Sequence, residues 1–317
     1  MAREKTRMIT SIGGQALIEG IMMRGPKKTA VSVRLPDHTV STKEIAVSGL
    51  RGKYKILKLP VLRGVAGFIE ALSVGYRALS YSADQAGLEE DEEPSKFDRF
   101  MERVFGDRLM NAVMAISGVL GVAIAVVLFF WLPTWLFNAG QSRLFGAGIA
   151  PWRSVVEGIM RILIFIGYIA FCASLPDIRR VFQYHGAEHK TIFCYENEEE
   201  LTVENVRRHK RFHPRCGTSF MVIMLLLGII VGFFIPFTNP FVRTAAKILC
   251  VPLIVGVGYE LIRICGKYDN VFTRILSAPG MWVQHITTKE PDDSMIEVAI
   301  AAMKEVIPEN GEDRIRK

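Results

Sequence analysis

Residues 220–235 read FMVIMLLLGIIVGFFI and lie inside a longer stretch without charged residues. A helix needs about 20 predominantly apolar residues to cross the hydrocarbon of a bilayer. We therefore predict a membrane-spanning helix near residues 219–237. Residues 109–142 also contain no Asp, Glu, Lys or Arg, and they predict a further span near residues 112–137.

Two more apolar stretches carry a few charges near their ends, and we expect spans there too, near residues 155–175 and 245–265. Such charges can pair or reach the interface, and buried helices of a soluble domain are the alternative. The chain has 317 residues, 50% of them hydrophobic and 22% charged, and its mean hydropathy of +0.25 is high for a soluble domain. The predicted fold class is a membrane α-helical protein with about four transmembrane helices.

Basic residues are concentrated in alternate connections between these spans. They precede the first span and fill the loop at residues 176–218, whereas the other connections hold few of them. Because cytoplasmic loops carry an excess of Lys and Arg, this loop and both termini are predicted to be cytoplasmic, in a multi-pass protein of the cell membrane. The same bias, with anionic lipids, explains the net charge of +7, so the bilayer is an expected partner and nucleic-acid binding is disfavoured.

The chain is predicted to divide into an N-terminal cytoplasmic β-rich α+β region at 1–93, a membrane domain at 94–268 and a C-terminal cytoplasmic segment at 269–317. Partial alternation of β-type residues before residue 47, broken by Gly and Pro, predicts a small antiparallel sheet. Residues 60–81 then change to helical periodicity with charged interruptions, which indicates an amphipathic helix. Similar helices are predicted at 97–109 and 294–307.

The loop at residues 176–218 contains the side chains with the most specific chemistry. Residues 184–190 read YHGAEHK, so His185 and His189 lie on one face of a helix, close enough to share a metal ion, with Glu188 beside them. The same order, His-x-x-Glu-His, occurs in inverted zinc peptidases, in which the carboxylate is the general base. The motif is short, so a peptidase is only one interpretation of it.

The end of the same loop, RFHPRCGTS at 211–219, places an imidazole and a thiol three positions apart, with Pro and Gly bending the backbone between and after them. If the apolar stretches on either side form a hairpin, the two ends of the loop meet at one membrane face. The predicted ligands of a tetrahedral zinc site, or of another divalent metal, are then His185, His189, His213 and Cys216, with Cys194 and His209 in reserve. The alternative is histidines that hydrogen-bond at the headgroup boundary and a cysteine that packs as a small apolar residue.

The number of ligands decides what such a site does. Four protein ligands close a zinc site and make it structural, whereas three leave a position for water. In the open case Glu188 is placed to accept the proton of that water. The sequence leaves both arrangements open.

Residues 12–26, IGGQALIEGIMMRGP, form a second unusual patch. Gln15, Glu19 and Arg24 stand among apolar residues and tight turns, so they could face a ligand or dock against the membrane domain. A sheet edge with solvated polar side chains is the alternative. The glycines do not match a phosphate-binding loop with its lysine, which disfavours nucleotide binding.

Several long motifs in order resemble the YqhQ family of bacterial membrane proteins: GGQALIEGIMMRGP, HGAEHKT, HPRCGTSF and QHITTKEP. The resemblance extends over nearly the whole chain. The family is uncharacterised and is sometimes described as predicted metal-dependent enzymes, which implies a metal site at the His and Cys motifs.

Two functions from different classes follow. In the one that the sequence favours slightly, a closed metal site ties the soluble parts to the helices, and the protein is a structural or regulatory partner of another membrane assembly, such as a translocation channel or a membrane protease. In the other, the protein is a membrane-embedded zinc-dependent hydrolase with Glu188 as general base. The hydrolase requires an open coordination position and a pocket that reaches Glu260 or the N-terminal patch.

Overall fold

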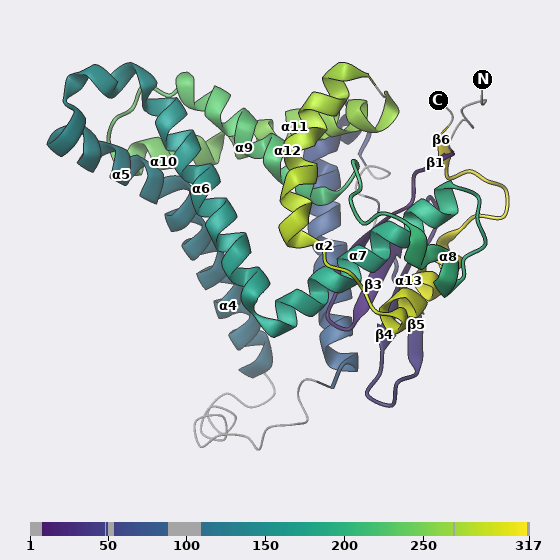
Figure 1. Cartoon of the computed structure of the whole chain (residues 1–317). Coiled ribbons are helices and arrows are strands. Elements are labelled where there is room, and N and C mark those ends of the chain that lie inside the picture. Colours follow the sequence, from purple (N-terminus) through teal and green to yellow (C-terminus); the bar gives the residue numbers. More distant parts are fainter. Residues whose placement is uncertain (1–7, 48, 50–53, 88–108, 269, 316–317) are drawn as a thin grey trace. The chain divides into compact units, whose positions relative to one another are not determined.

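The computed structural model describes residues 8–47, 49, 54–87, 109–268 and 270–315 (Figure 1). The chain folds into two compact units, and each combines segments that are distant in the sequence. Unit 1 consists of Met1–Gly87, Ile169–Met224 and Leu253–Lys317, and unit 2 consists of Leu88–Tyr168 and Leu225–Pro252. The helix predicted at 97–109, apart from its last residue, and the basic residues before the first span lie outside the described residues.

Unit 1 is built on a four-stranded antiparallel sheet, as the alternation near the N-terminus predicts. Its strands, in spatial and sequence order, are β2 (Gly13–Leu17), β3 (Gly20–Arg24), β4 (Thr29–Arg34) and β5 (Val40–Glu44). The short turn between β2 and β3 holds Glu19 in the left-handed region at φ 48°. A second, two-stranded sheet pairs β1 (Ile9–Thr10) with β6 (Arg314–Ile315), so it joins the two ends of the described chain.

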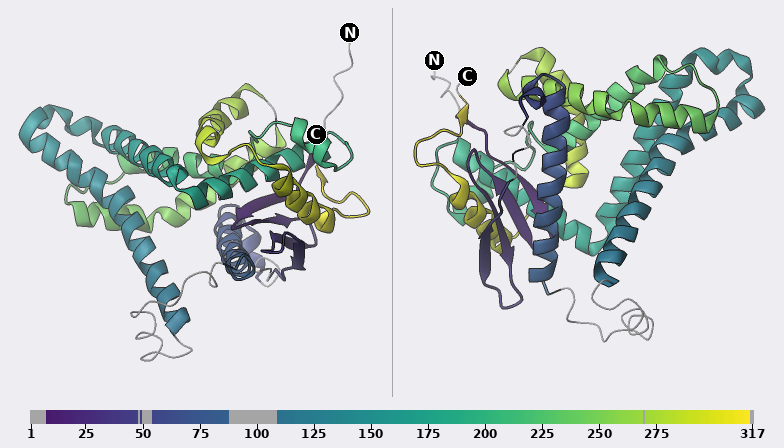
Figure 2. Two further views of the ribbon diagram at one scale, coloured as in Figure 1. Left: turned by 60° about the horizontal axis from the view of Figure 1, so that its bottom comes forward. Right: turned by 180° about the vertical axis from the view of Figure 1, so that it is seen from behind.

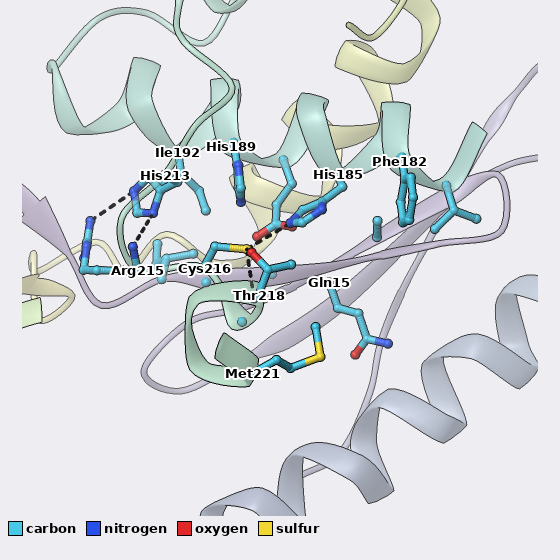
Figure 3. Close-up of a pocket in the computed structure, with 17 residues that line it drawn as sticks. Gln15, Phe182, His185, His189, Ile192, His213, Arg215, Cys216, Thr218 and Met221 are labelled. Carbon is cyan, nitrogen blue, oxygen red and sulfur yellow. Dashed lines mark hydrogen bonds between the residues drawn. The ribbon is translucent and has the colours of Figure 1, made fainter. Parts of the chain in front are cut away.

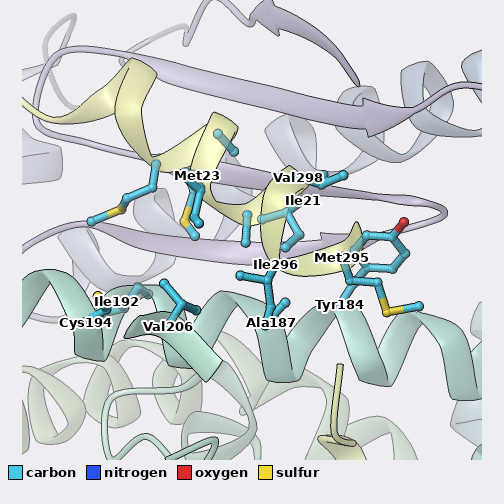
Figure 4. Packing of buried hydrophobic residues seen from close by; sticks show 14 of the residues in the cluster. Ile21, Met23, Tyr184, Ala187, Ile192, Cys194, Val206, Met295, Ile296 and Val298 are labelled. Carbon is cyan, nitrogen blue, oxygen red and sulfur yellow. The ribbon is translucent and has the colours of Figure 1, made fainter. Parts of the chain in front are cut away.

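Helices cover both faces of the four-stranded sheet (Figure 2). Helices α7 (Pro176–Glu196) and α13 (Asp293–Val306) pack on one face, and α2 (Leu62–Gln85) packs on the other. The core of the first face is apolar and fully buried (Figure 4), and it includes Ile21, Met23, Ala187, Met295, Ile296 and Val298. Helices α2 and α13 lie where the helical periodicity of 60–81 and 294–307 predicts them.

Local sequence explains how these helices begin. Pro176 occupies the first turn of α7, where a missing amide hydrogen costs nothing, and Asp177 follows it with a charge that suits a helix N-terminus. Asp292 caps α13 by accepting a hydrogen bond from the amide of Met295 at 2.9 Å. The remaining helices of unit 1 include α8 (Val203–Arg208) and α12 (Val271–Thr287).

Unit 2 contains helices and short connections but no strand in its described part. A long apolar helix runs through α4 (Leu109–Val126), a π-helical turn η3 (Val127–Trp131), α5 (Leu132–Gly140) and a second π-helical turn η4 (Gln141–Phe145). A 3₁₀ turn, η5 (Ala147–Trp152), leads into the second helix. The helices α6 (Arg153–Ser174), α9 (Gly217–Phe233) and α11 (Val251–Lys267) pass from one unit to the other, and α10 (Pro240–Leu249) completes unit 2.

Two helices are long and apolar enough to cross a membrane, Ile116–Arg143 and Gly148–Ser174, and the bent pair Pro240–Leu249 with Val251–Cys265 makes a third if it is one span. These counts refer to the described residues. Two or three helices thus meet the length and composition of a span, whereas the sequence predicts about four. The helix of the predicted span 219–237 ends at Phe233 after 17 residues, because Pro236 lacks an amide hydrogen and disfavours a helical residue before it. Pro252 explains the 45° bend of the pair in the same way.

Buried charges in unit 2 satisfy backbone groups that these irregular helices leave open. The Arg243 guanidinium donates to Glu157 at 3.0 Å and to the carbonyl oxygens of Ile235 and Gly232, beyond and within the last turn of α9. Lys247 also donates to Glu157, at 2.6 Å. Since a carbonyl without a partner is costly away from water, we assign this network a structural role.

Candidate metal centre

Helix α7 carries the first half of the centre. His185 and His189 lie one turn apart, as their spacing predicts, and their ring centroids are 4.4 Å apart. His189 is 1% exposed. Burial, followed by the charge of His185, lowers the pKa of His189, so this imidazole is held in the neutral form that binds metals.

Cys216 supplies the second half from the residue before α9. Its Sγ lies 3.2 Å from Nε2 of His185, and the amide and hydroxyl groups of Thr218 donate to it at 3.5 and 3.3 Å (Figure 3). Burial raises the pKa of the thiol, but His189 and the hydrogen bonds from Thr218 outweigh burial, and the pKa lies below its usual value. The ligand atoms of His185, His189 and Cys216 all lie within 4.8 Å of one another.

Both imidazoles are oriented by backbone carbonyls. Nδ1 of His185 is 2.8 Å from the carbonyl oxygen of Thr287, and Nδ1 of His189 contacts the carbonyl oxygen of Arg211. Because a carbonyl oxygen only accepts, both bonds place the ring proton on Nδ1 and leave Nε2 with a free lone pair. Metal-binding histidines almost always donate their other ring N–H in this way. The residues present therefore fit a metal ion, in ligand type, in tautomer and in spacing.

Glu188 lies beside this cluster and is 5% exposed. Burial raises the pKa of its carboxyl group to about 7, against the opposing effect of His185. The backbone of Gly14, in β2, also opposes this rise in pKa. A Cβ atom at position 14 would lie 2.9 Å from Cγ of Glu188 and 2.7 Å from the carbonyl oxygen of Met22, so a glycine is needed for this close approach.

The last residue of α12 and the segment that follows it pack over α7 at Gly186. A Cβ atom on Gly186 would lie 2.0 Å from the carbonyl oxygen of Lys289, and the amide of Lys289 donates to the carbonyl of Phe182 at 2.8 Å. We call residues 287–291 the strap. It carries the Thr287 carbonyl that orients His185, so the glycine of the His-Gly-Ala-Glu-His motif makes room for part of the metal centre.

His213, the fourth predicted ligand, does not join the other three. Its Nε2 lies 3.8 Å from Oε2 of the buried Glu196, which also accepts from Arg215. Its ring centroid is 5.6 Å from that of His189. The side chain of Gln284 fixes its backbone, since Oε1 accepts from the His213 amide at 2.7 Å and Nε2 donates to the His213 carbonyl at 2.8 Å. Three of the four predicted ligands therefore form one cluster, which is one of the two arrangements that the sequence leaves open.

A cavity of about 340 Å³ opens onto the cluster. Its walls come from β2, from one face of α7 and from the start of α9, and they include Gly14, Gln15, Phe182, Glu188, His213 and Met221 (Figure 3). The N-terminal patch thus reaches the site through its first residues. Glu260, the other residue that the pocket was predicted to reach, does not line this cavity. It forms a bidentate ion pair with Arg63 elsewhere in unit 1.

The known relatives agree with the resemblance in the sequence. Residues 59–309 match the family described as "Protein of unknown function (DUF1385)". The chain is also 31% identical over 304 residues to "Uncharacterized protein YqhQ" of Bacillus subtilis (strain 168), covering 96% of this chain and 94% of that protein. The chain belongs to the DUF1385 family. No solved structure matches it.

The part that matches DUF1385 contains all three clustered ligands, Glu188 and the strap, whereas β2 to β5 precede it. The other predicted site residues have partners of their own. Glu19 binds Arg180 at 2.5 and 2.6 Å and accepts from Tyr184, and Arg24 lies 3.8 Å from Glu70. Both pairs join the sheet to its covering helices.

Cys194 belongs to a different group of possible ligands, with Glu199 and His209, at the C-terminal end of α7. Its thiol faces the carbonyl oxygen of Glu200 at 3.5 Å, and burial raises its pKa to about 11. His209 is paired with Glu199 at 3.1 Å. Each of the three side chains thus has a partner within the protein.

Several residues of the centre escape prediction from the sequence alone. Thr287 and Arg211 act through backbone carbonyls, which every residue type possesses, so no letter signals them. Gln284 stands in the QHITTKEP motif, but nothing in the sequence says that its amide reaches His213. Glu196 was similarly hidden, although it lies seven residues after His189 and hence on the same face of α7.

Proposed function

We propose that this member of DUF1385 is a metal-dependent hydrolase anchored in a membrane, with His185, His189 and Cys216 as zinc ligands and Glu188 as general base. The observation that supports this most is the three-ligand cluster with a cavity on its open side. Catalytic zinc sites typically have three protein ligands and one position for water or substrate, whereas structural sites have four. The contact of His213 with Glu196 supports an open position, because it involves the fourth candidate ligand.

When bound, the metal lowers the pKa of a bound water toward neutrality and polarises the bond to be cleaved. The protein side chains do the rest. Glu188 accepts the proton of the water and returns it to the leaving group. The carbonyls of Thr287 and Arg211 keep the two imidazoles in the tautomer that the metal needs.

The remaining predictions from the sequence complete the proposal. The two apolar helices Ile116–Arg143 and Gly148–Ser174 would anchor the protein in the cell membrane, and this even number of crossings leaves both termini on one side. The basic residues around the centre place that side in the cytoplasm. Exposed positions give a test of this orientation, since a cysteine at Glu200 should resist an impermeant maleimide on intact cells, and a cysteine at Ser142 should react. The reverse labelling would contradict it. Partnership with a translocation channel or a membrane protease stays a prediction, and it requires a closed metal site.

Metal analysis of the purified full-length protein tests the centre itself. We expect about one zinc ion per chain, lost in His189→Ala and Cys216→Ser. His285→Ala is a matched control, since His285 is exposed and stacks on Phe212 away from the cluster. Glu188→Gln should keep the metal and lose the function in cells. A wild-type protein without metal, or a functional Glu188→Gln variant, would contradict the proposal.

A further inference from the structure

Strand β2 is an edge of the four-stranded sheet, and it forms a wall of the cavity at the metal centre. It has β3 as a partner on one side only. An edge strand presents a row of backbone N–H and C=O groups that can pair with another extended chain.

The hydrogen bonds of the neighbouring strands fix which residues of β2 face outward. The amide of Arg34 donates to the carbonyl of Glu19, and that of Gly25 donates to the carbonyl of Lys28, both at 2.8 Å, so the odd-numbered residues of β3 bond to β4. Its even-numbered residues then bond to β2. Since Gln15 is paired with Met22, Gln15 faces β3, and the residues on either side of it face outward.

These outward residues are Gly14 and Ala16. Gly14 lies against the proposed general base, since a Cβ atom there would be 2.9 Å from Cγ of Glu188, and Gly14, Ala16 and Glu188 line the same cavity. Ala16 turns its N–H and C=O in the same direction, two residues further along. The free edge of β2 therefore starts at the metal centre and leads away from it.

Space exists on both sides of this edge. The cavity at the metal centre, of about 340 Å³, and a second cavity, of about 580 Å³, share Gly13, Gly14 and Gln15 as lining. The second cavity extends along the α2 side of the strand to Arg24. A Cβ atom at Gly13 would meet nothing within 4 Å. Side chains of an extended peptide alternate between two faces, so two cavities flanking one free edge match the shape of an added strand.

We propose that the substrate is an extended polypeptide that pairs with the edge of β2 and thereby places a peptide bond at the metal centre. Main-chain pairing gives such complexes affinity for many sequences, and the pockets on either side select side chains. In the cleavage, the water oxygen joins the carbonyl carbon, the C–N bond breaks, and the departing nitrogen takes the proton that Glu188 received from the water. This inference rests on the proposed hydrolase for the cleavage, but not for the binding.

Binding can be measured without cleavage by using full-length Glu188→Gln protein in detergent and fluorescein-labelled casein, an unfolded polypeptide. Adding Ala16→Pro removes an outward N–H and keeps the bonds between β2 and β3, since proline is tolerated at an edge. We expect its Kd for casein, from fluorescence anisotropy, to rise at least about tenfold, the loss of roughly 1.4 kcal/mol of binding. Equal affinity in the two proteins, or no saturable binding of casein, would overturn the proposal.

The opposite edge of the sheet supplies the matched control. Glu44 in β5 is exposed and faces outward, because the amide of the next residue, Ile45, bonds to Thr29. Glu44→Pro should change the Kd for casein less than twofold. Zinc content and thermal unfolding show whether each variant is folded.

A second measurement does not depend on proline. A cysteine at Gly13, labelled with benzophenone maleimide, should photo-cross-link to casein above the level of the protein without that cysteine, and a cysteine at Glu44 should not. Equal cross-linking at the two positions would also overturn the proposal. Casein that binds at β2 but is never cleaved by the zinc-loaded Glu188 protein would contradict the peptidase step alone.

Discussion

The substitution Gly186→Ala tests whether the strap builds the metal centre. In an isolated helix the change would be favourable, because Ala is about 1 kcal/mol better than Gly in a helix interior. In this protein the new methyl group would lie 2.0 Å from the carbonyl oxygen of Lys289. That is far inside van der Waals contact, and the obstacle is backbone, so the strap must move.

The cost can be estimated from what the strap holds. Its movement breaks the bond from Lys289 to Phe182, worth about 0.5–1.5 kcal/mol, and overpacking of this kind costs about 1–3 kcal/mol. After subtraction of the gain in helix propensity, the free energy of unfolding should fall by about 0.5–3.5 kcal/mol. The Thr287 carbonyl moves with the strap, and loss of such a partner of a metal-binding histidine weakens metal affinity by about 10–100-fold.

Zinc competition with a chromophoric chelator and thermal unfolding in detergent measure both effects. Gly167→Ala is the matched control, since it also changes a helical glycine but a Cβ atom there meets nothing within 4 Å. It should leave zinc affinity unchanged and stability equal or higher. If Gly186→Ala binds zinc as tightly as the wild type and unfolds at the same temperature, the strap does not orient His185.

Three further substitutions or conditions have defined outcomes. Gln284→Ala removes both hydrogen bonds to the His213 backbone and should lower the free energy of unfolding by about 1–3 kcal/mol, measured by thermal unfolding, whereas an unchanged midpoint would contradict the clamp. Arg243→Met leaves buried carbonyl oxygens without a hydrogen-bond donor and removes one donor from the Glu157 carboxylate, so it should lower the free energy of unfolding by about 3–5 kcal/mol. Arg143→Met, at an exposed position in the same unit, should change the free energy of unfolding little. Burial raises the pKa of Cys194 to about 11, so its thiol is protonated at pH 7. The rate of its alkylation, measured on the peptide that contains it, should rise about tenfold per pH unit up to about pH 10. Fast alkylation at pH 7 would contradict the raised pKa.

The sequence predicts those parts of the fold that periodicity controls. Alternation and turn residues locate β2 to β5, and the i, i+4 spacing places His185 and His189 on one face of α7. The length of the apolar helices is less predictable, because the hydropathy of residues 219–237 is uniform while Pro236 ends the helix. The composition of a segment indicates whether it prefers water or an apolar environment, whereas a single proline can decide where its helix ends.

The sequence also predicts the metal site only in part. Three of the four predicted ligands come together in the structure. The sequence could identify them because His and Cys are recognisable as metal-binding residue types. Their orientation depends on the carbonyls of Thr287 and Arg211, which are positioned only by the folded chain. The sequence therefore identifies possible metal ligands, and the tertiary structure decides which of their ligand atoms lie close enough together to bind one ion.

Glu196 shows how a side chain that is not a ligand can set the chemistry of a metal centre. His185, His189 and Glu196 lie on one face of α7, and His213 faces this row from the opposite wall. A closed centre with four ligands would require His213 to turn from this row toward the cluster. The buried carboxylate of Glu196 instead pairs with His213 and Arg215, and these partners together outweigh burial and hold its pKa below the usual value. The anion that binds His213 thus favours an open centre, which a hydrolase needs and a purely structural zinc site does not.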